Sequence, residues 1–371
     1  MKFSTSREAL FRQLQSASRV AGTPAAGQAF SGIQFEATAG AGVEVRARDR
    51  ELGLRLPLEA EVERPGVCVL PARLILDVVR SLSGPTVGIE VRSAEQDVEL
   101  TAGGATFDIR TLRNEDFPPL PESGGDTVVR VPAAAFIATI ETVSRAASRD
   151  DTRPVLTGIL VSAADRELRM VATDSYRLSV KETALEAALG GSFEANVPAR
   201  ALQELSRIAQ QDGGDELSVA VRANQVVFGV GGATLSSTLI DGQFPNYRQL
   251  LPEAFEHELR MPVGELLEVV RRIGLLAQKN APLRLAFASG ELTVSAQTPD
   301  VGEARETLPA PYNGEAMDAG FNPDYLRDGL ESMDAGGDVV LKLISPLRPG
   351  LLESADGSGF LYLIMPIRLN A

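Results

Sequence analysis

The sequence has very little of the chemistry on which most enzymes and metal sites depend. It contains one cysteine and one histidine among 371 residues. The single Cys68 cannot form a disulfide within the chain, which is typical of proteins from a reducing compartment. Clustered His/Cys zinc sites cannot be built from these two residues. Any catalytic histidine would have to be His257, which we interpret as a surface residue. We therefore expect no catalytic site built on histidine or cysteine, and we predict no bound metal and no cofactor.

Signals for nucleotide binding, secretion and membrane insertion are also missing. The chain contains no GxxxxGK[ST] loop and no GxGxxG between a strand and a helix. Its N-terminus has no apolar signal region, and no apolar run approaches the roughly 18–20 residues that span a bilayer. These absences predict a soluble cytoplasmic protein.

The chain is acidic, with a formal net charge of −14. Such a charge at first argues against a nucleic-acid partner, because phosphate binding needs a basic surface. Asp and Glu are plentiful, so the composition does not exclude a carboxylate-based site, although no spacing points to one.

One pattern recurs three times, at intervals of about a third of the chain. A short alternating segment leads into an amphipathic helix in MKFSTSREALFRQLQSASRV from Met1, TVVRVPAAAFIATIETVSRAASR from Thr127 and HELRMPVGELLEVVRRIGLLAQK from His257. A second helix follows in step, in PARLILDVVRSL from Pro71, PARALQELSRIA from Pro198 and PDYLRDGLESM from Pro323. Two landmarks that move together indicate three copies of one unit.

Between these helices the chain consists mostly of short strands with period-two alternation. GVEVRARD, ELRMVATD and ELTVSAQT are three such strands, and they are in register with the repeat. The predicted fold class is therefore α+β, with three repeated domains that each pack two helices on antiparallel β-sheet. Linkers at 118–126 and 252–257 divide the chain into domains at 1–124, 127–253 and 256–371.

Charge is unevenly distributed over these domains. Arg and Lys outnumber Asp and Glu in every predicted helical segment except 323–333, so the rest of the chain is strongly acidic. Exposed arginines on a helix often serve only solubility and i,i+4 pairing. If repeated domains present their helices to one common surface, however, that surface would be positive and could hold a polyanion.

Several motifs go beyond periodicity. They are VATDSYRLSV at 171–180, STLIDGQFPNYRQLLP at 237–252, RTLRNEDFPPLP at 110–121, SPLRPGLLE at 345–353 and YLIMPIRL at 362–369. Together with the opening MKF and the threefold repeat, they resemble the beta subunit of bacterial DNA polymerase III, the beta sliding clamp family. The resemblance covers the whole chain, in order and with near-equal spacing. It implies a non-enzymatic processivity factor, a homodimeric ring whose helices surround double-stranded DNA without reading its sequence.

The resemblance also implies DNA-facing side chains on the helices. By analogy these are Arg7, Arg12, Arg19, Arg73, Arg80, Arg145, Arg149, Arg200, Arg207, Arg272 and Lys279. For subunit closure, the family's interface positions are matched by Phe107 and Ile109 in the first domain and by Leu275 and Leu276 in the third. Such a head-to-tail contact uses two different surfaces of the chain.

Between the second and third domains, the resemblance implies a groove for short linear motifs of polymerases, the clamp loader and repair proteins. Leu, Ile, Met and Pro would form its apolar walls, while Arg177 and Gln249 would hydrogen-bond the bound peptide. An apolar C-terminus such as MPIRL should fray unless it is docked, which favours a groove there. The matching positions are Leu156, Thr173, Ser175, Tyr176, Arg177, Leu178, Pro245, Gln249, Leu250, Leu363, Ile364, Met365, Pro366, Ile367, Arg368 and Leu369.

The sequence departs from the family in three places. The loop at 21–30 has no basic residue, although clamps often place one near DNA there. Pro349 stands where some relatives have a small polar residue at the rim of the groove. Asn370 and Ala371 extend past the usual Arg-Leu end and could crowd the groove.

Two other functions stay open at the level of sequence. One is a carboxylate-dependent enzyme built on repeated α+β domains, for which Asp174 is the best single candidate because it lies inside the ATDSYRL motif. The other is a scaffold that binds proteins and never encircles DNA.

Overall fold

The structure is a computed structural model that describes residues 1–23, 28–92, 94–120, 128–277 and 281–369. The chain forms two compact units. Unit 1 contains Met1–Ala134 and Glu204–Leu239, and unit 2 contains Ala135–Gln203 and Ile240–Ala371. Each unit therefore combines one outer repeat with about half of the second repeat, and the division into three domains stays a prediction.

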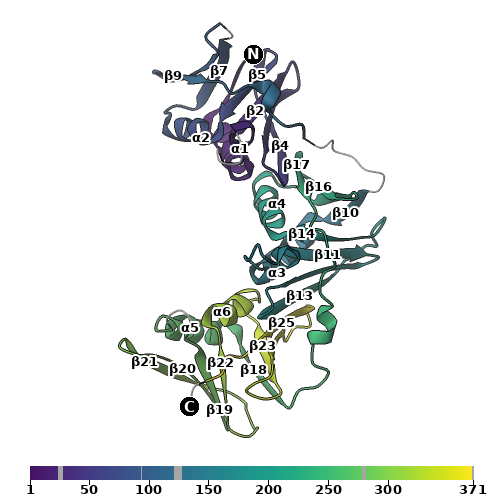
Figure 1. Cartoon of the computed structure of the whole chain (residues 1–371), viewed down its shortest axis with the longest axis vertical. Coiled ribbons are helices and arrows are strands. Elements are labelled where there is room, and N and C mark those ends of the chain that lie inside the picture. The colour runs from purple at the N-terminus through teal and green to yellow at the C-terminus, as the bar shows by residue number, and fades with distance from the viewer. Residues whose placement is uncertain (24–27, 93, 121–127, 278–280, 370–371) are drawn as a thin grey trace. The chain divides into compact units, whose positions relative to one another are not determined.

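The described part of unit 1 contains a five-stranded and an eight-stranded sheet, both antiparallel (Figure 1). The smaller sheet has the order β5 (Glu61–Arg64), β1 (Lys2–Ser6), β7 (Thr86–Arg92), β8 (Asp97–Ala102) and β9 (Ala105–Arg110). The larger has the order β10 (Val128–Pro132), β15 (Glu216–Val221), β16 (Gln225–Val230), β17 (Ala233–Thr238), β4 (Leu52–Leu58), β3 (Gly42–Arg48), β2 (Gly32–Thr38) and β6 (Gly66–Pro71).

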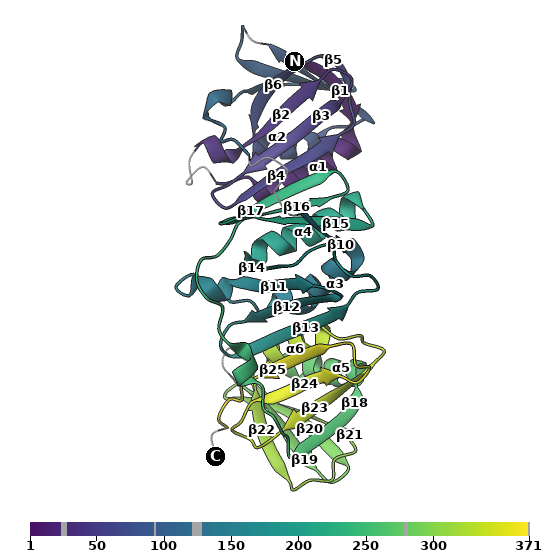
Figure 2. The same cartoon turned by 90° about the vertical axis from the view of Figure 1, so that its right-hand side faces the viewer.

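The described part of unit 2 repeats this plan with an eight-stranded and a four-stranded sheet (Figure 2). The larger has the order β14 (Phe193–Pro198), β11 (Gly158–Ala164), β12 (Glu167–Thr173), β13 (Arg177–Ala184), β25 (Phe360–Ile364), β24 (Gly350–Ser354), β23 (Asp338–Leu343) and β18 (His257–Pro262). The smaller has the order β21 (Gly302–Pro309), β20 (Glu291–Thr298), β19 (Leu283–Ala288) and β22 (Met317–Phe321).

Helices pack on the sheets of each unit because one stripe of each helix is apolar. In unit 1, α1 (Arg7–Val20) packs against α2 (Ala72–Ser81) and against β3 and β4. In unit 2, α5 (Val263–Gly274) packs against α6 (Pro323–Glu331) and against β18 to β21. The second repeat supplies α3 (Ala133–Val143) and α4 (Ala199–Asp212), each of which begins directly after a strand.

The helix boundaries follow from capping residues. The Ser6 side chain accepts a hydrogen bond from the N–H of Ala9 and begins α1. The Asn322 side chain accepts from the N–H groups of Asp324 and Tyr325 and begins α6, with Pro323 in the first turn. None of the described helices combines the length and apolar character needed to cross a membrane.

Candidate functional site

The junction between β13 and β25 joins the second repeat to the third and brings two sequence motifs together. Leu178 of ATDSYRL pairs with Leu363 near the C-terminus, and the N–H of Met365 donates a hydrogen bond to the carbonyl oxygen of Tyr176 at 2.9 Å. Leu178 and Leu363 are buried, whereas Tyr176 and Met365 remain exposed. Residues nearly two hundred positions apart thus form one surface with an apolar base.

The C-terminal segment is docked against the body of unit 2. The N–H of Ile367 donates to the carbonyl oxygen of Gly320 at 2.7 Å, and the side chain of Leu369 lies so close to Gly320 that a Cβ there would lie within about 3 Å of it. Pro366 is half-buried and Arg368 is exposed. A terminus with this many apolar side chains is therefore held in place, while Asn370 and Ala371 lie outside the described residues.

A loop that follows the second repeat covers the same junction. Phe244 and Tyr247 are buried in a cluster with Leu178 and Leu363. This anchoring leaves Pro245 and the rest of η6 (Tyr247–Leu250) after Tyr247 at the surface. Gln249 and Leu250 are exposed there. Leu156 is buried in η5 (Pro154–Thr157), and Ile364 is buried in β25. The positions expected from the sequence thus divide into a buried base and an exposed rim.

Sequence reasoning missed one residue of this surface. Leu347 is 62% exposed on the loop before β24, and β24 begins at Gly350, which pairs with Ile364. Only Pro349 of this loop was singled out from the sequence. The sequence signal for it is a leucine within the proline-rich turn SPLRPG. A large apolar side chain in such a turn is often exposed and available for binding.

The turn at 173–177 is built by its own polar side chains. Oδ1 of Asp174 accepts from the N–H groups of Tyr176 at 2.9 Å and of Arg177 at 3.0 Å. The hydroxyl of Thr173 donates to the carbonyl oxygen of Arg177 at 2.7 Å. Ser175 occupies the left-handed region, with φ of 79°. These contacts fix the conformation of the turn on which the exposed Tyr176 lies.

Arg177 is turned inward, although its sequence position matches the groove. Its side chain is 9% exposed, and its Nε lies 3.0 Å from Oδ2 of Asp174. The guanidinium stacks on the ring of Tyr325 at 4.3 Å and lies 3.3 Å from the hydroxyl of Tyr362. Burial works against its charge, but Tyr362, Asp328 and Asp174 outweigh that cost and raise the pKa of Arg177. Its geometry suits a residue that supports the groove from behind.

Asp174 does not have the surroundings of a catalytic acid. It is buried, and its two oxygens are occupied by the turn and by Arg177. Within the described residues, no three His, Cys, Asp or Glu side chains gather in a way that could hold a metal ion. Cys68 is buried in β6, where desolvation raises the pKa of the thiol to about 12.

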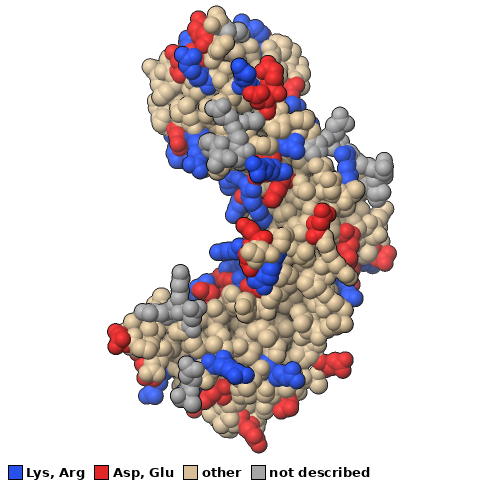
Figure 3. Space-filling view, in the orientation of Figure 1, with Lys and Arg blue, Asp and Glu red and all other residues tan. Residues whose placement is uncertain are grey.

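In unit 1, Lys and Arg side chains gather over α1, α2 and α4 (Figure 3). Arg19 and Arg207 both pair with the buried carboxylate of Glu204, which therefore ties α1 to α4. Arg12 lies 4.0 Å from Glu8, and Arg80 lies 3.4 Å from Asp77 and over the ring of Phe11. Among the described residues no carboxylate lies within 4 Å of Arg7 or Arg73. These two are the arginines of this face with the most available charge.

In unit 2 the basic side chains lie beside acidic ones (Figure 3). Arg145 pairs with Asp328 and Glu331 of α6, and Arg272 lies 2.9 Å from Glu306 of β21. Arg200 is exposed on α4 and is not free, whereas Arg149 has no carboxylate within 4 Å in the described part of the chain. Lys279 lies outside the described residues.

The acidic helix α6 neutralises arginines of its own unit. Burial opposes ionisation of Glu331, but the hydrogen bond from Arg271 and the charges of Arg145 and Arg271 outweigh it and lower the pKa of this carboxyl. Arg271 Nη2 lies 2.7 Å from Glu331, and Arg327 pairs with Asp324 at 2.9 Å. The negative charge of 323–333 is therefore matched locally.

Two strand edges lack the partner that equivalent strands have. The last strands of the three repeats are β9, β17 and β25, and the strands β4, β13 and β21 occupy equivalent places in them. In the eight-stranded sheets, β17 pairs with β4 and β25 pairs with β13. The corresponding strands β9 and β21 are edge strands of the described sheets. Phe107 on β9 is 36% exposed and Ile109 is buried, while Leu275 just after α5 is 84% exposed and Leu276 is half-buried.

Comparison with known proteins agrees with this architecture. Sequence models of the DNA polymerase III beta subunit match the N-terminal domain at 1–121, the central domain at 130–246 and the C-terminal domain at 248–368. The beta sliding clamp of Synechococcus elongatus is 32% identical over 325 residues, covering 86% of each chain. That of Streptomyces coelicolor is 31% identical over 328 residues, covering 85% of this chain and 86% of the relative.

Solved structures give the same result. The Bacillus subtilis sliding clamp superposes with a TM-score of 0.90 at 26% identity and full coverage of both chains. The Pseudomonas aeruginosa sliding clamp bound to griselimycin superposes with a TM-score of 0.88 at 29% identity, also over both whole chains. With three domain matches in order and relatives above 30% identity over most of its length, this chain belongs to the DNA polymerase III beta subunit family, the beta sliding clamps of DNA replication.

Proposed function

We propose that two copies of this chain close head to tail into a ring around duplex DNA and act there as a processivity factor, without enzymatic activity. The two unpaired strand edges carry this proposal. An exposed edge strand offers a row of free backbone N–H and C=O groups and pairs readily with another chain. A β9 edge on one copy and a β21 edge on another would form the same kind of joint that β17–β4 and β13–β25 form within the chain.

The repeat supports a definite register for this joint. Ala105 is the first residue of β9 and pairs with Ala102 across the β8–β9 turn. Ala233 has the same place in β17, where it pairs with Val230. The next residues, Thr106 and Thr234, are therefore equivalent. On the other edge Ala296 pairs with Ala304 as Ala47 pairs with Leu54, so Arg305 matches Arg55. Thr234 pairs with Arg55 within unit 1. Thr106 would therefore pair with Arg305 of a second copy, and Phe107 would lie opposite Ala304.

The helix faces support loose, sequence-independent contact with DNA. Arg7, Arg73 and Arg149 have no carboxylate within 4 Å among the residues that the structure describes, and a ring that holds DNA by its topology needs only a few such contacts. Each arginine that is already paired would have to give up a carboxylate to reach a phosphate. We propose that these three arginines make the main phosphate contacts and that the paired arginines contribute less to DNA binding. The protein would act in the cytoplasm, where the bacterial chromosome lies.

We propose that the surface at the β13–β25 junction is the groove for polymerases, the clamp loader and repair proteins. Its buried base of Leu178 and Leu363 and its exposed rim of Tyr176, Leu250 and Met365 suit an inserted apolar side chain. Griselimycin, bound to the P. aeruginosa clamp, is a ready probe for it. A tethered polymerase would rebind its primer end at an effective concentration that is often millimolar.

Loading on circular DNA tests the ring. The clamp is loaded onto a nicked circular plasmid with the clamp loader of the same organism, and the plasmid is then linearised. We expect the clamp to remain on the circle and to run off the free ends. Retention on linear DNA would instead support a scaffold that never encircles DNA.

Truncation tests the groove. Deleting the chain from Met365 onward should abolish griselimycin binding while the dimer persists, because the deleted segment bonds to β22, at the opposite edge of the four-stranded sheet from β21. Unchanged affinity for griselimycin would mean that the groove lies elsewhere.

A further inference from the structure

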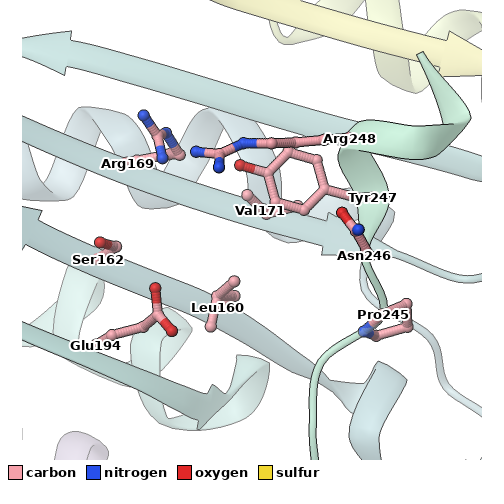
Figure 4. Close-up of a pocket in the computed structure, with 9 residues that line it drawn as sticks. All are labelled: Leu160, Ser162, Arg169, Val171, Glu194, Pro245, Asn246, Tyr247 and Arg248. Atoms are coloured by element: carbon pink, nitrogen blue, oxygen red, sulfur yellow. The ribbon is translucent and has the colours of Figure 1, made fainter.

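Unit 2 contains a cavity of about 120 Å³ that lies beside the proposed groove and shares Pro245 with it (Figure 4). It lies between the loop at 245–248 and strands β11, β12 and β14, on the sheet face that Tyr247 covers. We call it the Arg248 cavity. Leu160 and Val171 pair with each other across β11 and β12 and form its apolar floor.

A row of polar residues crosses the sheet at one end of the Arg248 cavity. Glu194 pairs with Ser162, Ser162 with Arg169, and Arg169 with Glu182, on four successive strands. Arg169 is held by carboxylates on its own side of the row, with its Nε 2.7 Å from Glu182 and a further ion pair to Glu167. Neighbouring strands lie about 4.8 Å apart, so Glu194 stands roughly 10 Å from the Arg169 backbone.

Arg248 reaches over this cavity from the loop. Its guanidinium lies 5.8 Å from the centre of the Tyr247 ring, and in Figure 4 it extends toward the guanidinium of Arg169 beside the Tyr247 hydroxyl. Arg248 is exposed, and among the described residues no carboxylate lies within 4 Å of it. Glu182 and Glu167 already balance the charge of Arg169. The charge of Arg248 is not balanced in this way within the described part of the chain, so an anion beside its guanidinium would be attracted to it.

We infer that the Arg248 cavity binds a carboxylate side chain, an Asp or Glu next to the motif of the partner segment that enters the groove. A carboxylate can accept two parallel hydrogen bonds from the fork of Arg248. The Tyr247 and Ser162 hydroxyls are further donors, and the methylene groups of the ligand rest on the partly exposed Leu160.

The position of the cavity ties it to the groove. Pro245 lines the cavity and is also a groove residue, while Tyr247 packs in one cluster with Leu178 and Leu363 of the groove base. A segment in the groove therefore needs only a short continuation to reach Arg248. This inference rests on the proposed function for the identity of the partner, although the cavity itself can be tested alone.

Glu194 allows a substitution that should increase the affinity of the cavity for a carboxylate. Among the described residues no Lys or Arg nitrogen lies within 4 Å of this carboxylate, so it repels an anion in the cavity without a local counter-charge. Replacing Glu194 by Gln should then strengthen carboxylate binding severalfold. A residue that only supported the fold would not produce a gain of this kind.

Saturation-transfer NMR on the full chain tests the inference with N-acetyl-aspartate amide and its neutral isostere N-acetyl-asparagine amide. We expect the aspartate compound to bind at least about tenfold more tightly, and Arg248→Gln to abolish this preference. Arg166→Gln, an exposed arginine on the β11–β12 turn, is the matched control and should keep it. Equal binding of both compounds, a preference that survives Arg248→Gln, or weaker binding in Glu194→Gln would overturn the inference.

Griselimycin separates this inference from the proposed groove. We expect griselimycin and N-acetyl-aspartate amide to bind the wild-type chain at the same time. If griselimycin binds and the aspartate compound does not, the cavity inference fails while the groove stands. If the aspartate compound binds through Arg248 and griselimycin does not bind, the groove fails while the cavity stands. Displacement of the aspartate compound by griselimycin would overturn the inference that the Arg248 cavity is a site separate from the groove.

Discussion

Nη1 of Arg177 lies 2.5 Å from Oδ2 of Asp328, and this ion pair joins strand β13 of the second repeat to helix α6 of the third. Both side chains are largely buried, at 9% and 17% exposure. Arg177 thus has its backbone in the proposed groove and its charge among the helices of the same unit. Asp328 of the acidic helix α6 thus serves as a counter-charge for Arg177.

Removing the charge of Asp328 should destabilise unit 2. Within the described part of the chain, the Asp328→Asn change leaves Asp174 as the one carboxylate that pairs with Arg177. Breaking a buried pair from one side typically costs about 3 kcal/mol or more. Because Asp174 remains, we expect a loss of about 2 kcal/mol in the urea unfolding free energy. Asp324→Asn is the matched control, because its pair with Arg327 is 2.9 Å long but Asp324 is 67% exposed. There we expect less than about 1 kcal/mol. Equal effects would argue against the ion pair as the cause.

Glu331 should make the folding stability of the protein fall at acidic pH. Its folded-state pKa lies below the ordinary value of 4.5, so it binds its proton less readily when folded than when unfolded. The stability it contributes is present above pH 4.5 and is lost as the pH falls through the folded-state pKa. Melting temperatures measured from neutral pH to pH 3 should therefore fall more steeply for the wild type than for Glu331→Gln. Parallel curves would contradict this prediction.

The proposed register of the subunit joint can be tested by cross-linking. A chain with Thr106→Cys and Arg305→Cys should form a disulfide-linked dimer under mild oxidation, seen as a band of twice the mass on a non-reducing gel. The native Cys68 is buried, with its thiol pKa raised to about 12, so it should contribute little background. Thr106→Cys with Thr307→Cys shifts one partner by two residues along β21 and should cross-link poorly. Efficient cross-linking of the shifted pair would reject the register.

The unpaired arginines should dominate contact with DNA. Replacing Arg7, Arg73 and Arg149 together by Gln should weaken binding to a fluorescent duplex and reduce the slope of log affinity against log salt, by up to about 0.9 for each lost phosphate contact. The comparison set is Arg80, Arg207 and Arg272, which already pair with Asp77, Glu204 and Glu306. A larger slope change in the comparison set would reject the assignment.

Ser175 should tolerate glycine but not valine. Its φ of 79° lies in the left-handed region, which glycine adopts freely and β-branched residues strongly avoid. We expect Ser175→Gly to stay within about 1 kcal/mol of the wild type and Ser175→Val to lose about 1–3 kcal/mol more. Thermal unfolding measures both. Griselimycin affinity should fall in the valine variant, because the turn that carries Tyr176 would be distorted.

Local pattern predicted the repeated elements well, because each depends on near neighbours. Leu10, Leu14 and Ala17 of α1 are fully buried on one side of the amphipathic helix that the sequence predicts there. The motif resemblance also identified segments that do meet, ATDSYRL and MPIRL. It could not tell which side chains face outward: Arg177 matches a groove position, yet its guanidinium points into the helix layer.

Counting charge on single helices was less informative, because it ignores what lies opposite each side chain. Arg145 and Arg149 stand four residues apart on one helical segment and looked equivalent in the sequence. In the structure Arg145 is held by Asp328 and Glu331, which come from a segment nearly two hundred residues later. The Arg248 cavity was equally hidden, since Glu194, Ser162 and Arg169 become neighbours only through strand pairing.

The sequence by itself determined the threefold α+β repeat and the family, because periodic burial, capping and short motifs are encoded by residues close together in the chain. Only the tertiary structure decided which arginines keep a free charge, which strand edges stay open and which polar residues share a cavity. Those properties depend on pairing between distant segments, where electrostatic energy and hydrogen bonding are set by distances of a few ångströms that no local pattern records.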